Sequence, residues 1–83
     1  DLMPLLRTVD FGERFAMEMR GLWAMHGMRM GGPFVSLSVL DEPRQRVVTA
    51  EGYIYAPQFD KREYLRTLEA VIYSLRFPED PLP

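Results

Sequence analysis

Soft metal-binding side chains are concentrated in one short stretch of the 83-residue sequence, which holds Met25, His26, Met28 and Met30. Thioether sulfur together with imidazole nitrogen is a ligand set that suits Cu(I). Methionine is also an adaptable filler of hydrophobic cores, and Met25 continues an alternating apolar pattern that begins several residues earlier. We therefore favour core packing over a metal centre for these methionines, and we expect the protein to need no cofactor.

Side chains suited to nucleophilic or acid-base catalysis are sparse. His26 is the only histidine and the chain has no cysteine, so the sequence indicates no pair of nucleophile and base. The Gly-Gly-Pro stretch at 31–33 precedes a strand pattern rather than a helix, which argues against a phosphate-binding loop. Asp41 and Glu42 fall in a predicted exposed turn, where carboxylates are solvated. The sequence favours a protein that is not an enzyme.

Three strands are expected to position the remaining polar side chains. Apolar and polar residues alternate with a period of two over residues 14–25, 34–40 and 46–56. The polar stretch 41–45 contains aspartate and proline and has a length suited to a hairpin turn between the second and third of these strands. The pattern therefore predicts an antiparallel meander.

A helix is expected at 61–76. Asp60 and Glu63 have the spacing of a capping box, and Pro78 cannot continue a helix. The residues that follow Glu63 place apolar side chains three and four positions apart, as on one face of a helix. This apolar stripe consists of Tyr64, Leu65, Leu68, Val71, Ile72 and Leu75.

The predicted fold class is α+β, a three-stranded antiparallel β-meander with one C-terminal helix packed on one face. Residues 1–12 show no clean period and are expected to be irregular, and the prolines of 78–83 predict a frayed tail. We expect residues 1–83 to be a single domain or the C-terminal fragment of a larger protein, and a first residue that is Asp1 rather than methionine favours the fragment.

The alternation also predicts the two faces of the sheet. The buried face is expected to hold Phe15, Met17, Met19, Trp23, Met25, Val35, Leu37, Val39, Val48, Ala50 and Ile54. The opposite face is expected to hold Arg14, Glu18, Arg20, Ser36, Ser38, Glu51, Tyr53 and Tyr55. Such half-polar faces meet water or are covered by a partner.

Tyrosine and arginine on that second face are residue types enriched in interaction hot spots. Our candidate binding residues are Arg20, Trp23, Glu51, Tyr53 and Tyr55. A small enzyme or ligand-binding domain is the alternative, with Glu51 as a base and Arg20 and Tyr53 as anion or hydroxyl partners on the same face.

Composition limits the classes of function. The chain has 10 basic and 12 acidic residues, a net charge of −2, and 47% apolar residues, which is typical of one globular domain. Without cysteine there is no disulfide framework or zinc-thiolate site. The near-neutral charge gives no electrostatic footprint for nucleic acid, and no stretch approaches the roughly 20 apolar residues of a membrane span.

Several short motifs are spaced along residues 20–77. They are Arg20-Gly21-Leu22-Trp23, Met30-Gly31-Gly32-Pro33-Phe34-Val35, the turn at Asp41, Glu51-Gly52-Tyr53, Tyr55-Ala56-Pro57, Lys61-Arg62, and Leu68-Glu69-Ala70 with Tyr73. With these motifs the chain resembles the C-terminal part of a Bacteroidetes envelope lipoprotein family that is known as a domain of unknown function. The resemblance implies a longer, lipid-anchored parent protein in the cell envelope, and it assigns no catalytic or ligand-binding residue.

We therefore expect a non-catalytic domain of an envelope lipoprotein that serves as a protein-interaction or structural module. The expected partners are the N-terminal portion of the parent protein, another envelope protein, or a second copy in a homodimer. The expected location is the periplasm or the outer membrane, although the residues alone are also compatible with the cytoplasm.

Overall fold

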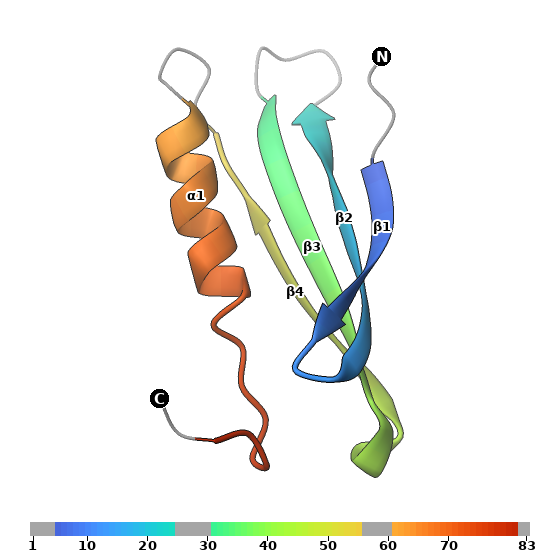
Figure 1. Ribbon diagram of the computed structural model, residues 1–83. Coiled ribbons are helices and arrows are strands. Elements are labelled where there is room, and N and C mark those ends of the chain that lie inside the picture. The colour runs from blue at the N-terminus through green and yellow to red at the C-terminus, as the bar shows by residue number, and fades with distance from the viewer. Residues whose placement is uncertain (1–4, 25–30, 56–60, 82–83) are drawn as a thin grey trace.

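A computed structural model describes residues 5–24, 31–55 and 61–81, which form one antiparallel sheet and one helix (Figure 1). The strands are β1 (Leu5–Phe11), β2 (Arg14–Ala24), β3 (Gly31–Asp41) and β4 (Arg46–Tyr53), in the spatial order β1-β2-β3-β4. The helix α1 spans Lys61–Ile72. The fold class is α+β, but the predicted three-stranded meander is wrong because the sheet has four strands.

The additional strand is β1, which lies within the stretch that we expected to be irregular. All seven of its residues pair with β2, from Leu5 opposite Arg20 to Phe11 opposite Arg14. A two-residue turn joins the strands, and both of its residues, Gly12 and Glu13, have positive φ values of 58° and 67°. This is the backbone that tight hairpins prefer. As an edge strand, β1 is exposed on both sides for most of its length, so its sequence carries no strong alternation.

A turn joins β3 to β4 close to the expected 41–45, but Asp41 itself is the last residue of β3 and is 0% exposed. Our prediction that its carboxylate is solvated is therefore wrong, because it is buried and binds Arg44 and Arg46. The turn contains a short 3₁₀ helix, Glu42–Arg44, and ends at Gln45 with a φ of 52°. β3 is longer than the expected strand at 34–40, and β4 ends before the expected strand at 46–56 does. Asp41 lies opposite Arg46 at the end of the ladder.

The two faces of β2 are the reverse of our prediction. Ala16 and Glu18 are 0% and 1% exposed, whereas Phe15 is 55% exposed. Glu18 lies opposite Leu37 in the register, which places both side chains on the face that α1 covers. Alternation separates two sets of side chains without saying which set is inside. Here the charged set is inside because Glu18 and Arg20 pair with each other and each of the three charged residues also has a partner outside β2, as described below.

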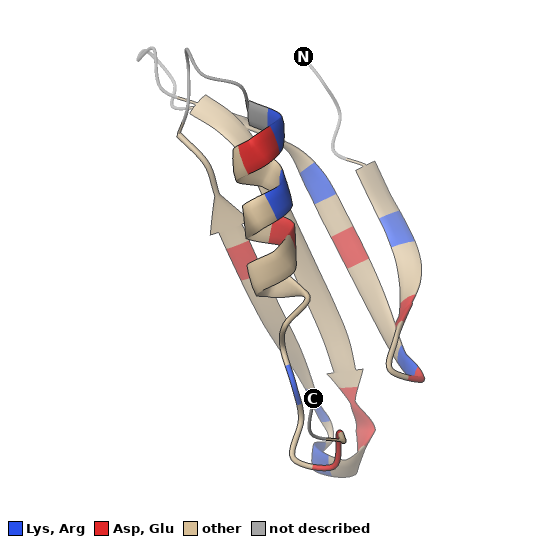
Figure 2. Ribbon diagram, turned by 60° about the vertical axis from the view of Figure 1, so that its left-hand side comes forward, with Lys and Arg blue, Asp and Glu red and all other residues tan. Residues whose placement is uncertain are grey.

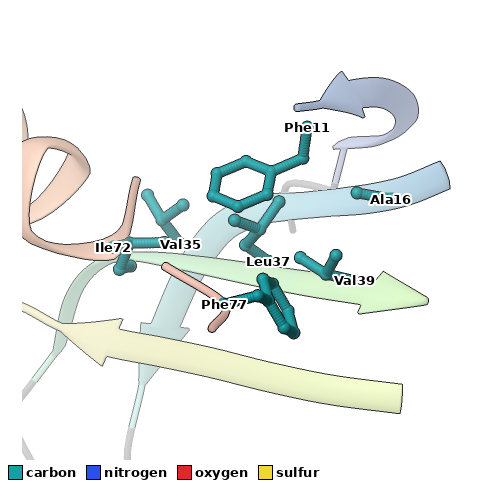
Figure 3. Packing of buried hydrophobic residues seen from close by; sticks show 7 residues of the cluster. All are labelled: Phe11, Ala16, Val35, Leu37, Val39, Ile72 and Phe77. Carbon is teal, nitrogen blue, oxygen red and sulfur yellow. The ribbon is translucent and has the colours of Figure 1, made fainter. Parts of the chain in front are cut away.

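The core lies between one face of the sheet and a layer formed by α1 and the residues that follow it. Val35, Leu37 and Val39 are fully buried, as the alternation of β3 predicts. The complete buried set is Phe11, Ala16, Val35, Leu37, Val39, Ile72 and Phe77 (Figure 3). Phe77 comes from the segment that continues after α1 toward the end of the sheet with the β1-β2 and β3-β4 turns (Figure 1). Burial of such side chains contributes roughly 1.5 to 3 kcal/mol each.

The helix packs against β3 and β4, and β1 forms the opposite edge of the sheet (Figure 1). Gly52 permits this approach, because a Cβ atom there would lie only 2.0 Å from Cδ1 of Leu68. Tyr64 and Val71, which we placed on the buried stripe, are 52% and 64% exposed. No helix in the part of the chain that the structure describes is long and apolar enough to cross a membrane.

The helix ends four residues earlier than expected. Its last turn closes with the Tyr73 amide donating to Glu69 O (2.8 Å), and the Ser74 hydroxyl donates to Val71 O (2.6 Å). The capping residue that we expected, Asp60, lies outside the described residues. The resulting molecule is thin and elongated, with a radius of gyration of 14.5 Å, against about 12 Å for a compact chain of this length.

Candidate protein-interaction face

One face of the sheet carries neither the helix nor the segment that follows it, and we call it the open face. The register assigns it the side chains of Leu6, Thr8, Asp10, Phe15, Met17, Met19, Trp23, Phe34, Ser36, Ser38, Leu40, Val47, Thr49, Glu51 and Tyr53. Large apolar side chains of β2 follow one another along this face, with an interruption at Gly21, and a stripe of hydroxyl groups crosses β3 and β4 beside them. The open face is therefore more apolar than the half-polar surface that we expected.

The apolar side chains of the open face are accessible to solvent. Leu6, Phe15, Leu40, Val47 and Tyr53 are between 37% and 63% exposed. Together, side chains of this size expose on the order of 500 Å² of surface, with Leu40 and Val47 directly paired in the register and Tyr53 at the other end of β4. A surface of this kind is typical of an interaction site.

Three aromatic rings from β2, β3 and β4 form a cluster at the end of the open face that is farthest from the β1-β2 turn. The rings of Phe34 and Tyr53 are stacked with centroids 5.6 Å apart, and Trp23 meets Tyr53 edge-on at 6.3 Å. The indole Nε1 of Trp23 donates a hydrogen bond to Ile54 O at 3.0 Å. We call Trp23, Phe34 and Tyr53 the aromatic cluster.

The absence of a side chain at Gly32 makes room for the aromatic cluster. A Cβ atom on Gly32 would lie 1.8 Å from Ile54 O and 3.5 Å from Nε1 of Trp23. The strands also remain paired beyond the end of β4, where the Ile54 amide donates to Pro33 O at 2.9 Å. The indole is thus anchored to the backbone, and the cluster is held in one arrangement before any partner binds.

Hydroxyl groups beside the aromatic cluster donate long hydrogen bonds to the carboxylate of Glu51, and two further hydroxyl groups pair with each other. The hydroxyl of Tyr53 donates to Oε1 of Glu51 at 3.4 Å, and the hydroxyl of Ser36 donates to Oε2 at 3.3 Å. The hydroxyls of Ser38 and Thr49 share a hydrogen bond of 2.9 Å. The carboxylate of Glu51 is exposed and has no cationic partner among the described residues.

Three of our five candidate residues, Trp23, Glu51 and Tyr53, come together on the open face. Tyr55 lies beyond the end of β4 and is 55% exposed. Arg20 does not belong to this group, because it lies on the face that α1 covers and pairs with Glu69 of the helix (2.6 Å). The catalytic grouping of Glu51 with Arg20 and Tyr53 is therefore not formed.

Sequence reasoning missed other members of the open face, notably Phe15, Met17 and Met19, which we expected to be buried, and Phe34. The signal that identifies them is the strand register. Met17 lies opposite Ser38 and Met19 lies opposite Ser36, so the methionines share the face of the serines. That register cannot be read from β2 alone.

The opposite face holds a buried carboxylate, Glu18, in a network of charged hydrogen bonds. Arg20 donates to it twice (Nε to Oε1, 3.0 Å; Nη2 to Oε2, 2.9 Å), Arg7 Nε donates to Oε1 at 3.0 Å, and the hydroxyl of Tyr73 donates to Oε2. Burial by itself raises the pKa of Glu18, but the hydrogen bonds from Arg20, Tyr73 and Arg7 outweigh it and lower the pKa to about 2. Burial and the hydrogen bond to Glu18 raise the pKa of Tyr73 to about 12. We call these residues the Glu18 network.

A second charged cluster joins the C-terminal segment to the β1-β2 and β3-β4 turns, at the end of the sheet opposite the aromatic cluster (Figure 2). Residues 78–83, which we expected to fray, include Glu79 and Asp80, whose carboxylates bind Arg14 at 3.0 and 2.9 Å. Glu79 also binds Arg44 (2.8 Å), which in turn binds Asp41 (2.8 Å). Hydrogen bonds from Arg44 and then Arg14 lower the pKa of Glu79 to about 2. This cluster is closed within the chain and offers no unpaired group to a ligand.

Metal binding finds no support among the residues described. No group of three acidic or histidine side chains there is placed to hold a metal ion. The stretch with Met25, His26, Met28 and Met30 lies outside the described residues, so the copper hypothesis is not addressed by the structure.

A family model described as "Domain of unknown function (DUF4837)" matches residues 1–74 of the chain. No curated protein and no solved structure matches the chain. The match covers all four strands and α1. The open face and the Glu18 network are therefore both within the part of the chain that the family model covers.

Proposed function

This chain belongs to the family described as Domain of unknown function (DUF4837), and we propose that it is a non-catalytic domain whose open face binds another protein. The proposed partner presents an apolar surface that also carries basic side chains. The observation that carries this proposal is the set of large apolar side chains that the open face exposes, with Phe15, Val47 and Tyr53 being 55%, 63% and 58% exposed.

An apolar surface on the partner follows from the character of the open face. Sheets with one solvated face usually place polar residues on it. Here the side of β2 toward solvent carries phenylalanine, two methionines and tryptophan, whereas the charged residues of β2 are on the covered side. Methionine-rich and aromatic surfaces are adaptable and bury a large area for each residue, which suits contact with a protein.

Basic side chains on the partner follow from the charges of the open face. Its charged residues, within the described ranges, are Asp10 on β1 and Glu51 on β4, with no lysine or arginine. Two copies packed through this face would bring four carboxylates together without a cation. A cationic, apolar partner is therefore favoured over a second copy.

The test uses the isotope-labelled 83-residue chain and two designed amphipathic helical peptides that share a leucine face. One peptide carries arginine on its polar face and the other carries glutamate. We expect the arginine peptide to shift the amide resonances of β2 and of the end of β4, with sub-millimolar affinity, and the glutamate peptide to bind at least tenfold more weakly.

A matched pair of variants locates the binding. Phe15→Ser on the open face is expected to weaken binding at least fivefold, whereas Val71→Ser, an exposed apolar residue on α1, leaves it unchanged. Light scattering across a wide concentration range checks the state of the free chain. Binding that is absent, or that is equal in both variants, would refute the proposal, and a dimer disrupted by Phe15→Ser would identify a second copy as the occupant instead.

We further propose that the domain works in the cell envelope as part of a longer, lipid-anchored protein. The support is the resemblance of its spaced motifs to an envelope lipoprotein family. Mass spectrometry of the parent protein from its native cells, with proteolysis of intact and permeabilised cells, tests this location. An unlipidated parent found in the cytoplasmic fraction would overturn it.

A further inference from the structure

We infer that Glu51 and the aromatic cluster form a subsite for one arginine side chain of the partner. The inference rests on the proposed function, since it specifies which part of the open face receives a basic residue. The subsite combines an exposed carboxylate, an exposed tyrosine ring and an anchored indole within one corner of the sheet.

The carboxylate of Glu51 differs from the other carboxylates that the sheet and the C-terminal segment hold in hydrogen bonds. Glu18, Asp41 and Glu79 each bind two arginines, and Asp80 binds one. Glu51 instead accepts hydrogen bonds of 3.3 and 3.4 Å from two uncharged hydroxyl groups, which are longer than the closest contacts of the ion pairs, 2.6 to 3.0 Å. These hydroxyl groups keep the carboxylate beside the ring of Tyr53 while leaving its charge uncompensated.

The aromatic rings beside Glu51 supply the second element of the subsite. Tyr53 is 58% exposed and stacks on Phe34, so one side of the pair remains open to a ligand. A cation within about 6 Å of such a ring is attracted by the ring's quadrupole. Arginine is favoured over lysine because its planar guanidinium stacks on a ring while its N–H groups bind a carboxylate.

The same combination already occurs within this chain, at the opposite end of the molecule. The guanidinium carbon of Arg14 lies 4.1 Å from the centroid of the Phe77 ring, and its Nη2 binds the carboxylates of Glu79 and Asp80. In that case the arginine, the ring and the acids all come from the chain itself. At Glu51 the ring and the acid are present, and the arginine is left to the partner.

The experiment measures how strongly the domain distinguishes arginine from its neutral isostere. Trp23 is the only tryptophan of the chain, so its fluorescence reports on this corner directly. The probes are the arginine peptide used above and the same peptide with citrulline in place of each arginine. We expect the wild-type chain to bind the arginine peptide about fivefold to tenfold more tightly, from one exposed ion pair and one cation–π contact.

Two charge-removing variants on the open face provide the comparison. Glu51→Gln is expected to reduce the preference for arginine at least threefold, and the matched Asp10→Asn, at the other end of the face, is expected to reduce it less than twofold. Tyr53→Leu should also reduce it, through loss of the ring. A preference that Glu51→Gln leaves intact would overturn the subsite while leaving the proposed function standing. Failure of both peptides to bind the wild-type chain would instead refute the proposed function and the subsite with it.

Discussion

Removing the charge of Glu18 tests whether the buried network holds the two edges of the structure together. Glu18→Gln keeps the size of the side chain but replaces one acceptor oxygen with an amide that can only donate. Four hydrogen bonds converge on the two carboxylate oxygens, from Arg7, from Arg20 twice and from Tyr73. At least one of these donors must then face another donor.

The expected loss is about 2 kcal/mol of unfolding free energy at pH 7. Breaking a buried ion pair costs about 3 to 5 kcal/mol when the remaining charge is fully buried. Arg7 and Arg20 retain 56% and 27% side-chain exposure, so water can solvate part of the charge left behind and the cost is smaller. For a chain of this size, with a total stability of about 4 to 12 kcal/mol, the change is easily measured.

The pH dependence of the unfolding free energy tests whether the charge of Glu18 causes this loss of stability. The pKa of Glu18 is about 2 in the folded chain, below its ordinary value of 4.5, so the carboxylate stabilises the fold fully above pH 4.5 and loses that contribution as the pH falls toward 2. Urea unfolding, followed by circular dichroism from pH 7 to pH 2, should show the wild type and Glu18→Gln converging in this range. The exposed Glu63→Gln serves as control. A difference below 0.5 kcal/mol at pH 7, or one that stays constant down to pH 2, would refute this account.

Four further substitutions test the packing and the assignment of the faces. Gly32→Ala should destabilise the fold strongly and alter the tryptophan fluorescence, because its Cβ would lie 1.8 Å from the backbone oxygen of Ile54, which cannot move aside; an unchanged urea midpoint would contradict this. Gly52→Ala meets only the end of a leucine side chain of α1 and should cost about 1 to 2 kcal/mol in the same assay. Leu37→Ala should cost about 2 to 5 kcal/mol because Leu37 is fully buried, whereas Phe15→Ala should cost less than about 1 kcal/mol; equal costs would show that the open face is covered in solution.

Local sequence patterns were sufficient for the elements with strong periodicity. The alternation of β3 correctly predicted Val35, Leu37 and Val39 as core, and the polar stretch after it correctly predicted a turn, although Asp41 is buried at the end of β3. One side of β3 carries valine and leucine and the other carries serine at its centre, so the pattern also predicts which side is buried. The candidate site was predicted in part, because Trp23, Glu51 and Tyr53 do lie together.

The sequence by itself determined that strands alternate with turns, that one amphipathic helix follows them, and which side chains of each strand share a face. Only the tertiary structure decided that β1 completes the sheet and that the charged side of β2 faces inward. An edge strand buries too little to need a strong pattern, so its sequence does not reveal it. A charged set becomes the inner face only when its partners arrive from distant parts of the chain, as Arg7 and Tyr73 do for Glu18, because an unpaired buried carboxylate would be too costly.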